Sequence, residues 1–142
     1  MIRSMEPADL DRVMEIWLEA NRQGHPFIPD SYWVDNVPLV RELLPQAEVW
    51  VEETEGAIGG FIGIVEGGFV AGLFVAVTRQ ASGIGRALLE HGKARYPALG
   101  LHVYAENERA VRFYRKNGFV QSGEMVNGDT GHREYEMNWS RA

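Results

Sequence analysis

The chain of 142 residues contains no cysteine. This absence excludes disulfide bonds, a thiolate nucleophile and every metal site built on thiolates. The 4 histidines are scattered along the sequence without the spacing of a metal site, so we expect no bound metal. A chain without cysteine suits a reducing compartment, and we expect a cytoplasmic protein.

Basic residues are also scarce, since Lys and Arg number 14 against 20 Asp and Glu, for a net charge of -6. An acidic protein repels phosphate polymers and anionic membranes, so we expect no nucleic acid and no membrane as partner. No run approaches the roughly 20 apolar residues of a membrane span, and the start MIRSMEPADL lacks the pattern of a signal peptide. A cationic amine is the partner that this charge favours.

The apolar periodicity predicts one compact domain over residues 1–142, with 45% hydrophobic residues to form its core. The predicted elements are a strand at 1–4, a helix that ends in the segment 21–30, a second helix capped by Ser31 that ends near Pro45, strands at 49–53, 57–66 and 69–77, a helix at 83–95, a strand at 99–105, a helix at 107–117, and strands at 119–125 and 132–139. Glu55-Gly56 and Gly67-Gly68 suit tight hairpins, which predicts an antiparallel meander. The strand at 69–77 is apolar throughout, as expected of a strand covered on both faces. A parallel strand-helix-strand crossover follows it.

The stretch VTRQASGIGRALLEHG, residues 77–92, runs from this strand through a turn of small residues into a helix. The first amides of a helix have no partner within it and can bind a phosphate. A dinucleotide fingerprint would need glycine at position 88, which is Leu88, and the Walker sequence is missing, so both of these phosphate sites are disfavoured. Taken alone, the turn fits a simple tight turn equally well.

The segment at 80–85 has the pattern Q/R-x-x-G-x-G/A, formed by Gln80, Ala81, Ser82, Gly83, Ile84 and Gly85. The segment at 107–119 has the pattern N-x-x-A-x-x-F-Y-x-x-x-G-F, formed by Asn107, Ala110, Phe113, Tyr114, Gly118 and Phe119. These two motifs resemble those of the GNAT family of N-acetyltransferases. Val77 and Ala81 depart from the proline and glycine common in that family, but neither change removes a backbone donor. The resemblance implies an α/β (α+β) fold with a mixed, mostly antiparallel seven-stranded sheet, a central parallel β-α-β pair and about four helices.

The resemblance also implies that acetyl-CoA is the acyl donor and lies between the central strand and the strand at 99–105. The expected donor-binding residues are Phe74, Val75, Val77, Gln80, Ala81, Ser82, Gly83, Ile84, Gly85, Arg86, Asn107, Ala110 and Phe113. The implied activity is acetyl transfer to a primary amine of a small molecule, a lysine or a peptide N-terminus, by direct attack on the thioester. An acyl-CoA-binding regulator with little or no turnover is the alternative.

Acetyl transfer needs a proton for the leaving thiolate and a neutral amine. By resemblance Tyr114 is the general acid, although its helical spacing alone also fits a core aromatic residue. The central strand carries no carboxylate, so Glu66, Glu106 and His25 remain open as general bases.

The loop GHPFIPDSYW, residues 24–33, gathers polar and aromatic side chains around two prolines. Because loops between the first two helices border the acceptor in the resembling family, we expect His25, Phe27 and Trp33 to bind the acceptor, together with His102 of the strand at 99–105. Phe27 and Trp33 fit core packing equally well, and His25 fits an exposed turn. The sequence leaves the identity of the acceptor open, and the protein could be a monomer or a homodimer.

Overall fold

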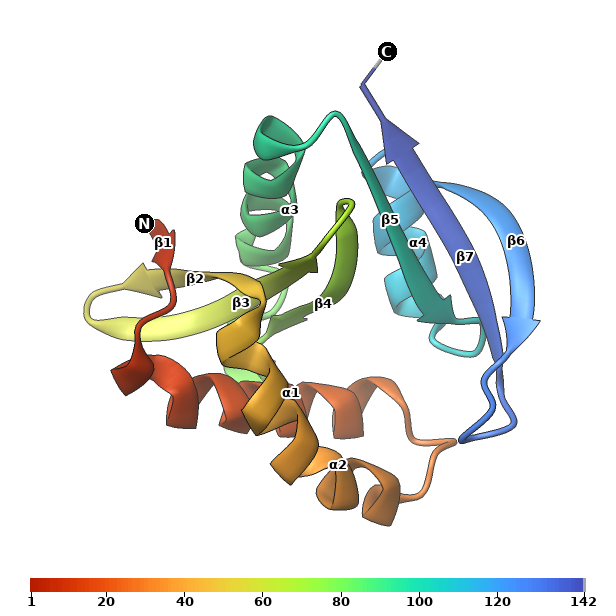
Figure 1. The fold of residues 1–142 in the computed structure, drawn as a ribbon, viewed down its shortest axis with the longest axis horizontal. Coiled ribbons are helices and arrows are strands. Elements are labelled where there is room, and N and C mark those ends of the chain that lie inside the picture. Colours follow the sequence, from red (N-terminus) through yellow and green to blue (C-terminus); the bar gives the residue numbers. More distant parts are fainter. Residues whose placement is uncertain (142) are drawn as a thin grey trace.

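The computed structural model describes residues 1–141 and contains one seven-stranded mixed sheet (Figure 1). The strands are β1 (Ile2–Ser4), β2 (Glu48–Thr54), β3 (Ala57–Val65), β4 (Phe69–Val75), β5 (Ala98–Tyr104), β6 (Val120–Val126) and β7 (Arg133–Ser140), in the spatial order β1-β2-β3-β4-β5-β7-β6. Within the described residues only β4 and β5 pair in parallel, and all other neighbouring strands are antiparallel. The predicted fold class is therefore confirmed.

Helices cover the sheet in two layers. They are α1 (Leu10–Gly24), α2 (Asp30–Leu43), α3 (Ile84–Arg95) and α4 (Glu108–Lys116). One core cluster joins α1 and α2 to one face of β2 and β3, while the second joins α3 and α4 to the opposite face of the sheet, including β5 and β7. On the other face of β5 and β7, the cluster of α1 and α2 includes Tyr104 alone within residues 1–141. We call the part of this face around the half-exposed His102 the open face.

The hairpins follow the turn chemistry of the sequence. Glu55 and Gly56 have φ of 53° and 78°, and Gly67 and Gly68 have φ of 85° and 80°. Two consecutive residues with positive φ twist a turn in the sense that a hairpin needs, and glycine adopts this conformation without steric cost. These two turns hold β2, β3 and β4 in the predicted meander.

A β-bulge bends β4 at Ala71. Gly63 of β3 pairs with Gly72, whereas the next residue, Ile64, pairs with Val70, so Ala71 is an extra residue on β4. A bulge of this kind leaves one residue unpaired and increases the local bend of its strand. Beyond it, β4 turns away from β5.

The two parallel strands accordingly pair at one position only. Phe69 is level with Gly100, and the Gly100 amide donates to the carbonyl oxygen of Gly68 at 3.0 Å. From there the strands diverge like the arms of a V (Figure 1). The prediction that the central strand is covered on both faces is wrong, because Ala71 is exposed and most of β4 is only half-buried.

Two predicted boundaries also need correction. The central strand ends at Val75, and Val77 begins a short 3-10 helix that runs to Arg79, so the strand does not reach residue 77. Helix α2 begins at Asp30 with Pro29 as its N-cap, not with Ser31. The strand ends earlier than its apolar pattern indicates, and the helix begins earlier than its expected capping residue indicates.

None of the helices in residues 1–141 combines the length and the hydropathy that a membrane span requires.

Candidate active site

The space between the diverging strands is a cavity of about 770 Å³, which we call the β4/β5 gap. It is bordered by β4, by β5, by the end of α1, by the turn before α3 and by the first turns of α4. Its narrow end lies near Val70 and Leu101, next to the single paired position, and its wide end lies at the turn. The gap leaves the β5-facing edge of β4 without a strand to pair with, so backbone donors and acceptors there are available to a ligand.

The turn at the wide end places backbone amides at the start of α3. Ala81 and Gly83 have φ of 62° and 87°, and a side chain at Gly83 would meet no atom within 4 Å. The turn is tied to the sheet by Gln80, whose Nε2 donates to the carbonyl oxygen of Val75 at 3.3 Å. Arg109 of α4 donates to Oε1 of the same side chain at 2.9 Å. The N-terminus of α3 is thus open and positioned to receive an anion.

Most of the predicted donor-binding residues line the gap. They are Phe74, Val75, Gln80, Ala81, Gly83, Ile84, Gly85, Asn107, Ala110 and Phe113. Three do not: Val77 is exposed in the 3-10 helix, Arg86 is exposed on α3, and the Ser82 hydroxyl donates to the carbonyl oxygen of Arg79. A turn directs successive side chains to different sides, so adjacency in the motif does not bring every residue to the cavity.

Tyr114 lies on the side of α4 that faces the gap and is 9% exposed. Its ring packs edge-on against Phe113 and Phe119, with ring centroids 5.3 Å and 5.6 Å apart. Burial raises the pKa of Tyr114 above its usual range, because the phenolate would be poorly solvated. The phenol therefore keeps its proton at neutral pH, which is the state that a proton donor requires.

His25 is buried where α1 ends and links that helix to α4. Its Nδ1 lies 3.0 Å from the carbonyl oxygen of Asn21, and its Nε2 lies 3.2 Å from Nδ2 of Asn107. The carbonyl needs a donor and the amide nitrogen needs an acceptor, which assigns the ring proton to Nδ1. Burial lowers the pKa of His25, so the ring is neutral. His25 is not an exposed turn residue.

Asn107 is the N-cap of α4, and its Oδ1 accepts a hydrogen bond from the Ala110 amide at 3.3 Å. The side-chain nitrogen of Asn107 donates to His25, the C-cap residue of α1, so the side chain contacts the ends of both α1 and α4. This contact joins the α1 side of the gap to the α4 side.

The other loop residues predicted for the acceptor lie nearby. Trp33 stacks on His25 with ring centroids 5.1 Å apart and borders the gap. Phe27 does not border the gap, but it lies with Trp33 along an adjoining recess of about 450 Å³. The Phe27 ring contacts Tyr104 and His132, with ring centroids 5.8 Å and 5.1 Å apart. The loop therefore covers the end of β5 and meets the β6–β7 loop (Figure 1).

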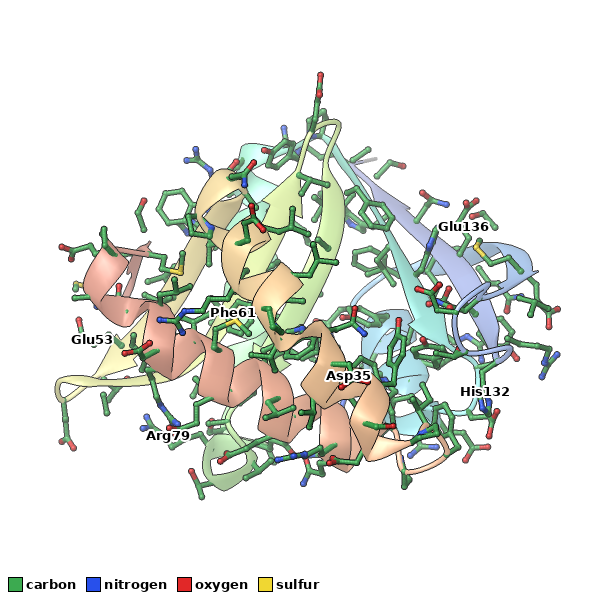
Figure 2. The ribbon with its side chains drawn as sticks, turned by 60° about the horizontal axis from the view of Figure 1, so that its bottom comes forward. Asp35, Glu53, Phe61, Arg79, His132 and Glu136 are labelled. Atoms are coloured by element: carbon green, nitrogen blue, oxygen red, sulfur yellow. The ribbon has the colours of Figure 1, made fainter. Side chains whose placement is uncertain are left out.

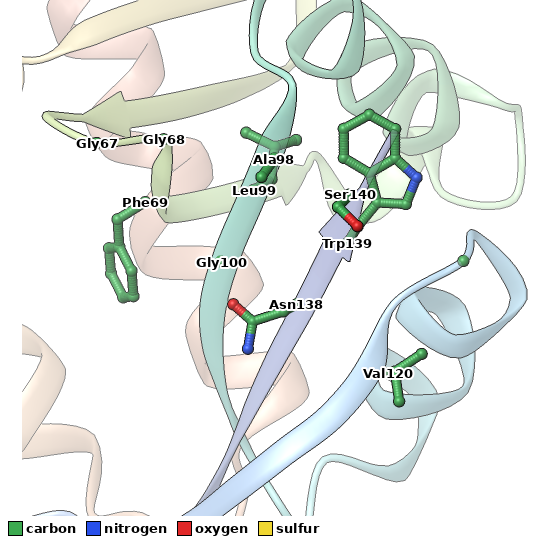
Figure 3. Close-up of a pocket in the computed structure, with 11 residues that line it drawn as sticks. Gly67, Gly68, Phe69, Ala98, Leu99, Gly100, Val120, Asn138, Trp139 and Ser140 are labelled. Atoms are coloured by element: carbon green, nitrogen blue, oxygen red, sulfur yellow. The ribbon is translucent and has the colours of Figure 1, made fainter. Parts of the chain in front are cut away.

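His102 is the predicted acceptor residue on the open face. It borders the gap, its side chain is 36% exposed, and its Nε2 lies 3.9 Å from Oε2 of Glu136 on β7. Figure 2 shows Glu136 and His132 on the part of the molecule that α1 and α2 leave uncovered. The rings of His102 and Phe69 form a T-shaped pair, with centroids 5.0 Å apart. Phe69 also lines a second cavity of about 620 Å³, which extends past Gly100 and Asn138 (Figure 3).

Several residues that border the gap were not predicted. They include Ala71, Tyr104, Arg109, Arg112 and Glu134, whereas Glu106, which also borders the gap, was a candidate base. Arg109 and Arg112 follow the N-cap of α4 by two and five residues, and this spacing could have indicated that they border the gap. Nothing local marked Glu134, because it comes to the gap through the pairing of β7 with β5. Glu106 accepts a hydrogen bond at 2.7 Å from His132, which tertiary structure alone brings to it.

Within the part of the chain that the structure describes, no group of three or more histidine or carboxylate side chains is placed to hold a metal ion.

Comparison with known proteins agrees with this site. The family model described as an acetyltransferase (GNAT) domain matches residues 45–121. The chain is 44% identical over 120 residues to the peptidyl-lysine N-acetyltransferase YiaC of Escherichia coli K12, across 84% of this chain and 82% of the relative. It is 31% identical over 132 residues to the peptidyl-lysine N-acetyltransferase YjaB of the same organism, across 92% of this chain and 88% of the relative. The solution structure of apo YjaB from Escherichia coli superposes with a TM-score of 0.88 at 29% identity, over 100% of this chain and 98% of that one.

The chain belongs to the GNAT family of acetyltransferases. It is an N-acetyltransferase that uses acetyl-CoA as acyl donor and an amine as acceptor. Because its relatives are named as enzymes, the alternative of a binding protein without turnover is not favoured.

Proposed function

We propose that the acceptor is the side-chain amine of a lysine in a protein or peptide. The observation that carries this proposal is the likeness, over most of the chain, to two relatives named peptidyl-lysine N-acetyltransferases. The net charge of -6 supports it, because an acidic protein attracts a cationic acceptor.

The shape of the site also suits a long side chain. The loop at 24–33 and the β6–β7 loop contact each other through Phe27 and His132, and the Tyr32 hydroxyl lies 3.5 Å from Oδ2 of Asp129. These contacts cover Tyr104, which is 8% exposed. An acceptor on this side must therefore reach the gap over the open face beside His102, and a lysine can extend its amine there while its backbone stays outside.

On the donor side, we propose that the amides of the turn bind the pyrophosphate of acetyl-CoA. Arg109 and Arg112, which border the same end of the gap, add positive charge there. The free edge of β4 at Phe74 and Val75 would pair with the amides of the pantetheine arm. With the phosphates held at the wide end, the thioester points towards the narrow end of the gap.

Tyr114 then serves as the general acid. The neutral amine attacks the thioester carbon directly, the carbon–sulfur bond breaks, and the thiolate takes the phenolic proton. The nitrogen loses its remaining extra proton as the amide forms, and through solvent this proton restores the phenol. A positioned proton donor typically contributes about 10²- to 10⁴-fold to the rate.

Thiol release from acetyl-CoA tests the choice of acceptor. The panel contains a blocked peptide with a single lysine, the same peptide with the lysine acetylated and its N-terminus free, and spermidine. We expect the highest kcat/KM for the blocked lysine peptide. A higher value for spermidine or for the free N-terminus would overturn the proposed acceptor, while leaving the acetyltransferase activity itself established by the same assay.

A further inference from the structure

The proposed mechanism has an acid but no base. An amine with a pKa near 10.4 is protonated at neutral pH in all but about one molecule in a thousand, so deprotonation costs roughly 4 to 5 kcal/mol. A group that accepts this proton must reach the acceptor where it meets the thioester. The two faces of the sheet differ at the gap, and this difference indicates on which side such a group lies.

The gap is bordered differently on its two faces. On one face α4 packs on Leu101 and Val103 and contributes Tyr114. On the other face β5 directs His102 outward, because successive side chains of a strand alternate between faces. The acceptor enters from this open face, so its ammonium group passes His102 before it reaches the thioester.

His102 also lies at the correct depth. It is two residues beyond Gly100, the residue paired with Phe69, and so it borders the narrow end of the gap. This is the end towards which the thioester points once the phosphates are bound at the turn. An extended strand rises about 3.3 Å per residue, which places His102 roughly 7 Å from the last paired position.

The surroundings of His102 suit a proton acceptor. Glu136 on β7 is the nearest charge, and its carboxylate stabilises an imidazolium once the proton has been transferred. Phe69 of β4 packs against the ring on the other side. The remaining titratable groups that face this position are Tyr104 on β5 and Glu134, which pairs with it on β7. No Lys or Arg of residues 1–141 pairs with Glu136 or takes part in this cluster.

The candidates that the sequence left open fit less well. His25 has both ring nitrogens engaged, by Asn21 and by Asn107. Glu106 borders the gap, but its carboxylate is engaged by His132. Glu66 is exposed at the β3–β4 hairpin and does not border the gap.

We propose that His102 is the general base that takes the proton from the acceptor ammonium group. This inference rests on the proposed function, since it uses the proposed position of acetyl-CoA. The proton moves from the ammonium nitrogen to a ring nitrogen of His102 and then to solvent, and the freed lone pair attacks the thioester. Acid and base thus act from opposite faces of the gap, with Tyr114 on the α4 side and His102 on the open side.

Turnover of the blocked lysine peptide by His102→Gln tests the proposal. We expect kcat to fall about 10²-fold or more, with the KM for acetyl-CoA unchanged. The pH dependence of the rate should also change in the variant, because the amine must then lose its proton without His102. In His102→Ala, added imidazole should restore part of the rate. A matched control is His91→Gln, because His91 packs against Trp50 away from the gap and its replacement should leave the rate and its pH dependence unchanged.

The role of Glu136 provides a second readout. In Glu136→Gln the imidazolium loses its stabilising charge, so the pH dependence of the rate should shift while the variant remains active. A merely structural role of His102 would produce neither this shift nor rescue by imidazole.

His102→Gln with wild-type kcat and pH dependence would overturn the proposal. So would loss of the thermal stabilisation by acetyl-CoA in this variant, because His102 would then act on the donor. Failure of the proposed acceptor is distinguishable, since the wild-type enzyme would then prefer another amine of the panel. The same variants measured with that amine decide the role of His102.

Discussion

The two edges of β4 behave in opposite ways. Along its β3 edge the strand is paired from Phe69 to Val75, and along its β5 edge it pairs at Phe69 alone. The strand therefore completes a sheet on one side, and its residues 70–75 border a cavity on the other. Pairing on one edge anchors the strand, and the lack of pairing on the other leaves its backbone groups for a ligand.

The bulge at Ala71 explains why β4 is paired along one edge and almost unpaired along the other. The extra residue is accommodated on the β3 side without loss of the ladder beyond it. The bend that it introduces carries β4 away from β5, where the loops and α4 border the opening. The gap thus depends on the bulge in the pairing of β4 with β3. Variants can test the paired edge and the unpaired edge of β4 separately.

The largest effect is expected in the gap beside the unpaired edge of β4, in the variant Tyr114→Phe on α4. Loss of the phenolic proton should lower kcat about 10²- to 10⁴-fold, while the ring stays packed against Phe113 and Phe119. Steady-state thiol release measures kcat, and the thermal shift with acetyl-CoA measures donor binding. Acetyl-CoA at about a hundred times its dissociation constant should still stabilise the variant by roughly 2.7 kcal/mol. Turnover equal to wild type across pH would remove Tyr114 as the acid.

Deletion of Ala71 should close the open edge. Without the bulge β4 straightens and can continue to pair with β5, so the backbone groups offered to acetyl-CoA are used within the sheet. The loss of two or three ligand hydrogen bonds should weaken acetyl-CoA binding by about 2 to 3 kcal/mol. Calorimetric titration measures this change, and circular dichroism confirms that the variant is folded. Unchanged affinity in a folded variant would contradict the role given to the bulge.

Gly60→Ala should instead disturb the paired edge. A Cβ at this position of β3 would lie 2.8 Å from the carbonyl oxygen of Phe74 and 2.9 Å from Cγ2 of Ile84. Because a backbone atom cannot move aside cheaply, we expect a loss of about 1 to 3 kcal/mol of stability, measured by urea unfolding. Gly128→Ala is the matched control, since a Cβ there would meet no atom within 4 Å. Equal stability of the two variants would show that β3 and β4 can accommodate a Cβ at position 60, contrary to the short distances above.

Two substitutions of Asn107 can separate its role as the N-cap of α4 from its hydrogen bond to His25. Asn107→Ala should cost about 1 kcal/mol through loss of the N-cap. Asn107→Asp keeps an oxygen for the Ala110 amide but removes the donor to His25, so it should retain most of this stability. A carboxylate beside His25 should also raise the pKa of its ring, and NMR titration of the histidine signals measures that change. Equal destabilisation by the two substitutions would contradict this separation.

The smallest effect is expected from pH. Burial lowers the pKa of His25 below its unfolded value, so near and below pH 6.5 the unfolded chain binds more protons than the folded one. Stability should therefore fall as the pH decreases from 7 to 5. His91 contributes in the same direction, because desolvation also lowers its pKa. Thermal unfolding across this range should show a weaker pH dependence for His25→Gln than for wild type, and an identical dependence would exclude a contribution from His25.

Much of the fold followed from local patterns. The hairpins at Glu55-Gly56 and Gly67-Gly68, the order of the elements and the start of α3 after Gly83 depend on backbone conformations that neighbouring residues set. The early end of β4 at Val75 was missed, because apolar side chains continue past it. The Ala71-Gly72 pair inside that strand was a local hint of a bulge, since small residues in a strand often mark one.

The amino-acid sequence by itself determined the family, the seven strands and four helices of residues 1–141, and the placement of Tyr114 on the helix beside the site and of Asn107 at its start. Only the tertiary structure decided that His25 is buried and neutral, that His132 pairs with Glu106, and that His102 lies at the narrow end of an open gap. The physical reason is that turns and helix caps are fixed by contacts a few residues apart, whereas the gap exists because β4 bends between partners far apart in the chain. Burial and charge at the site follow from that bend.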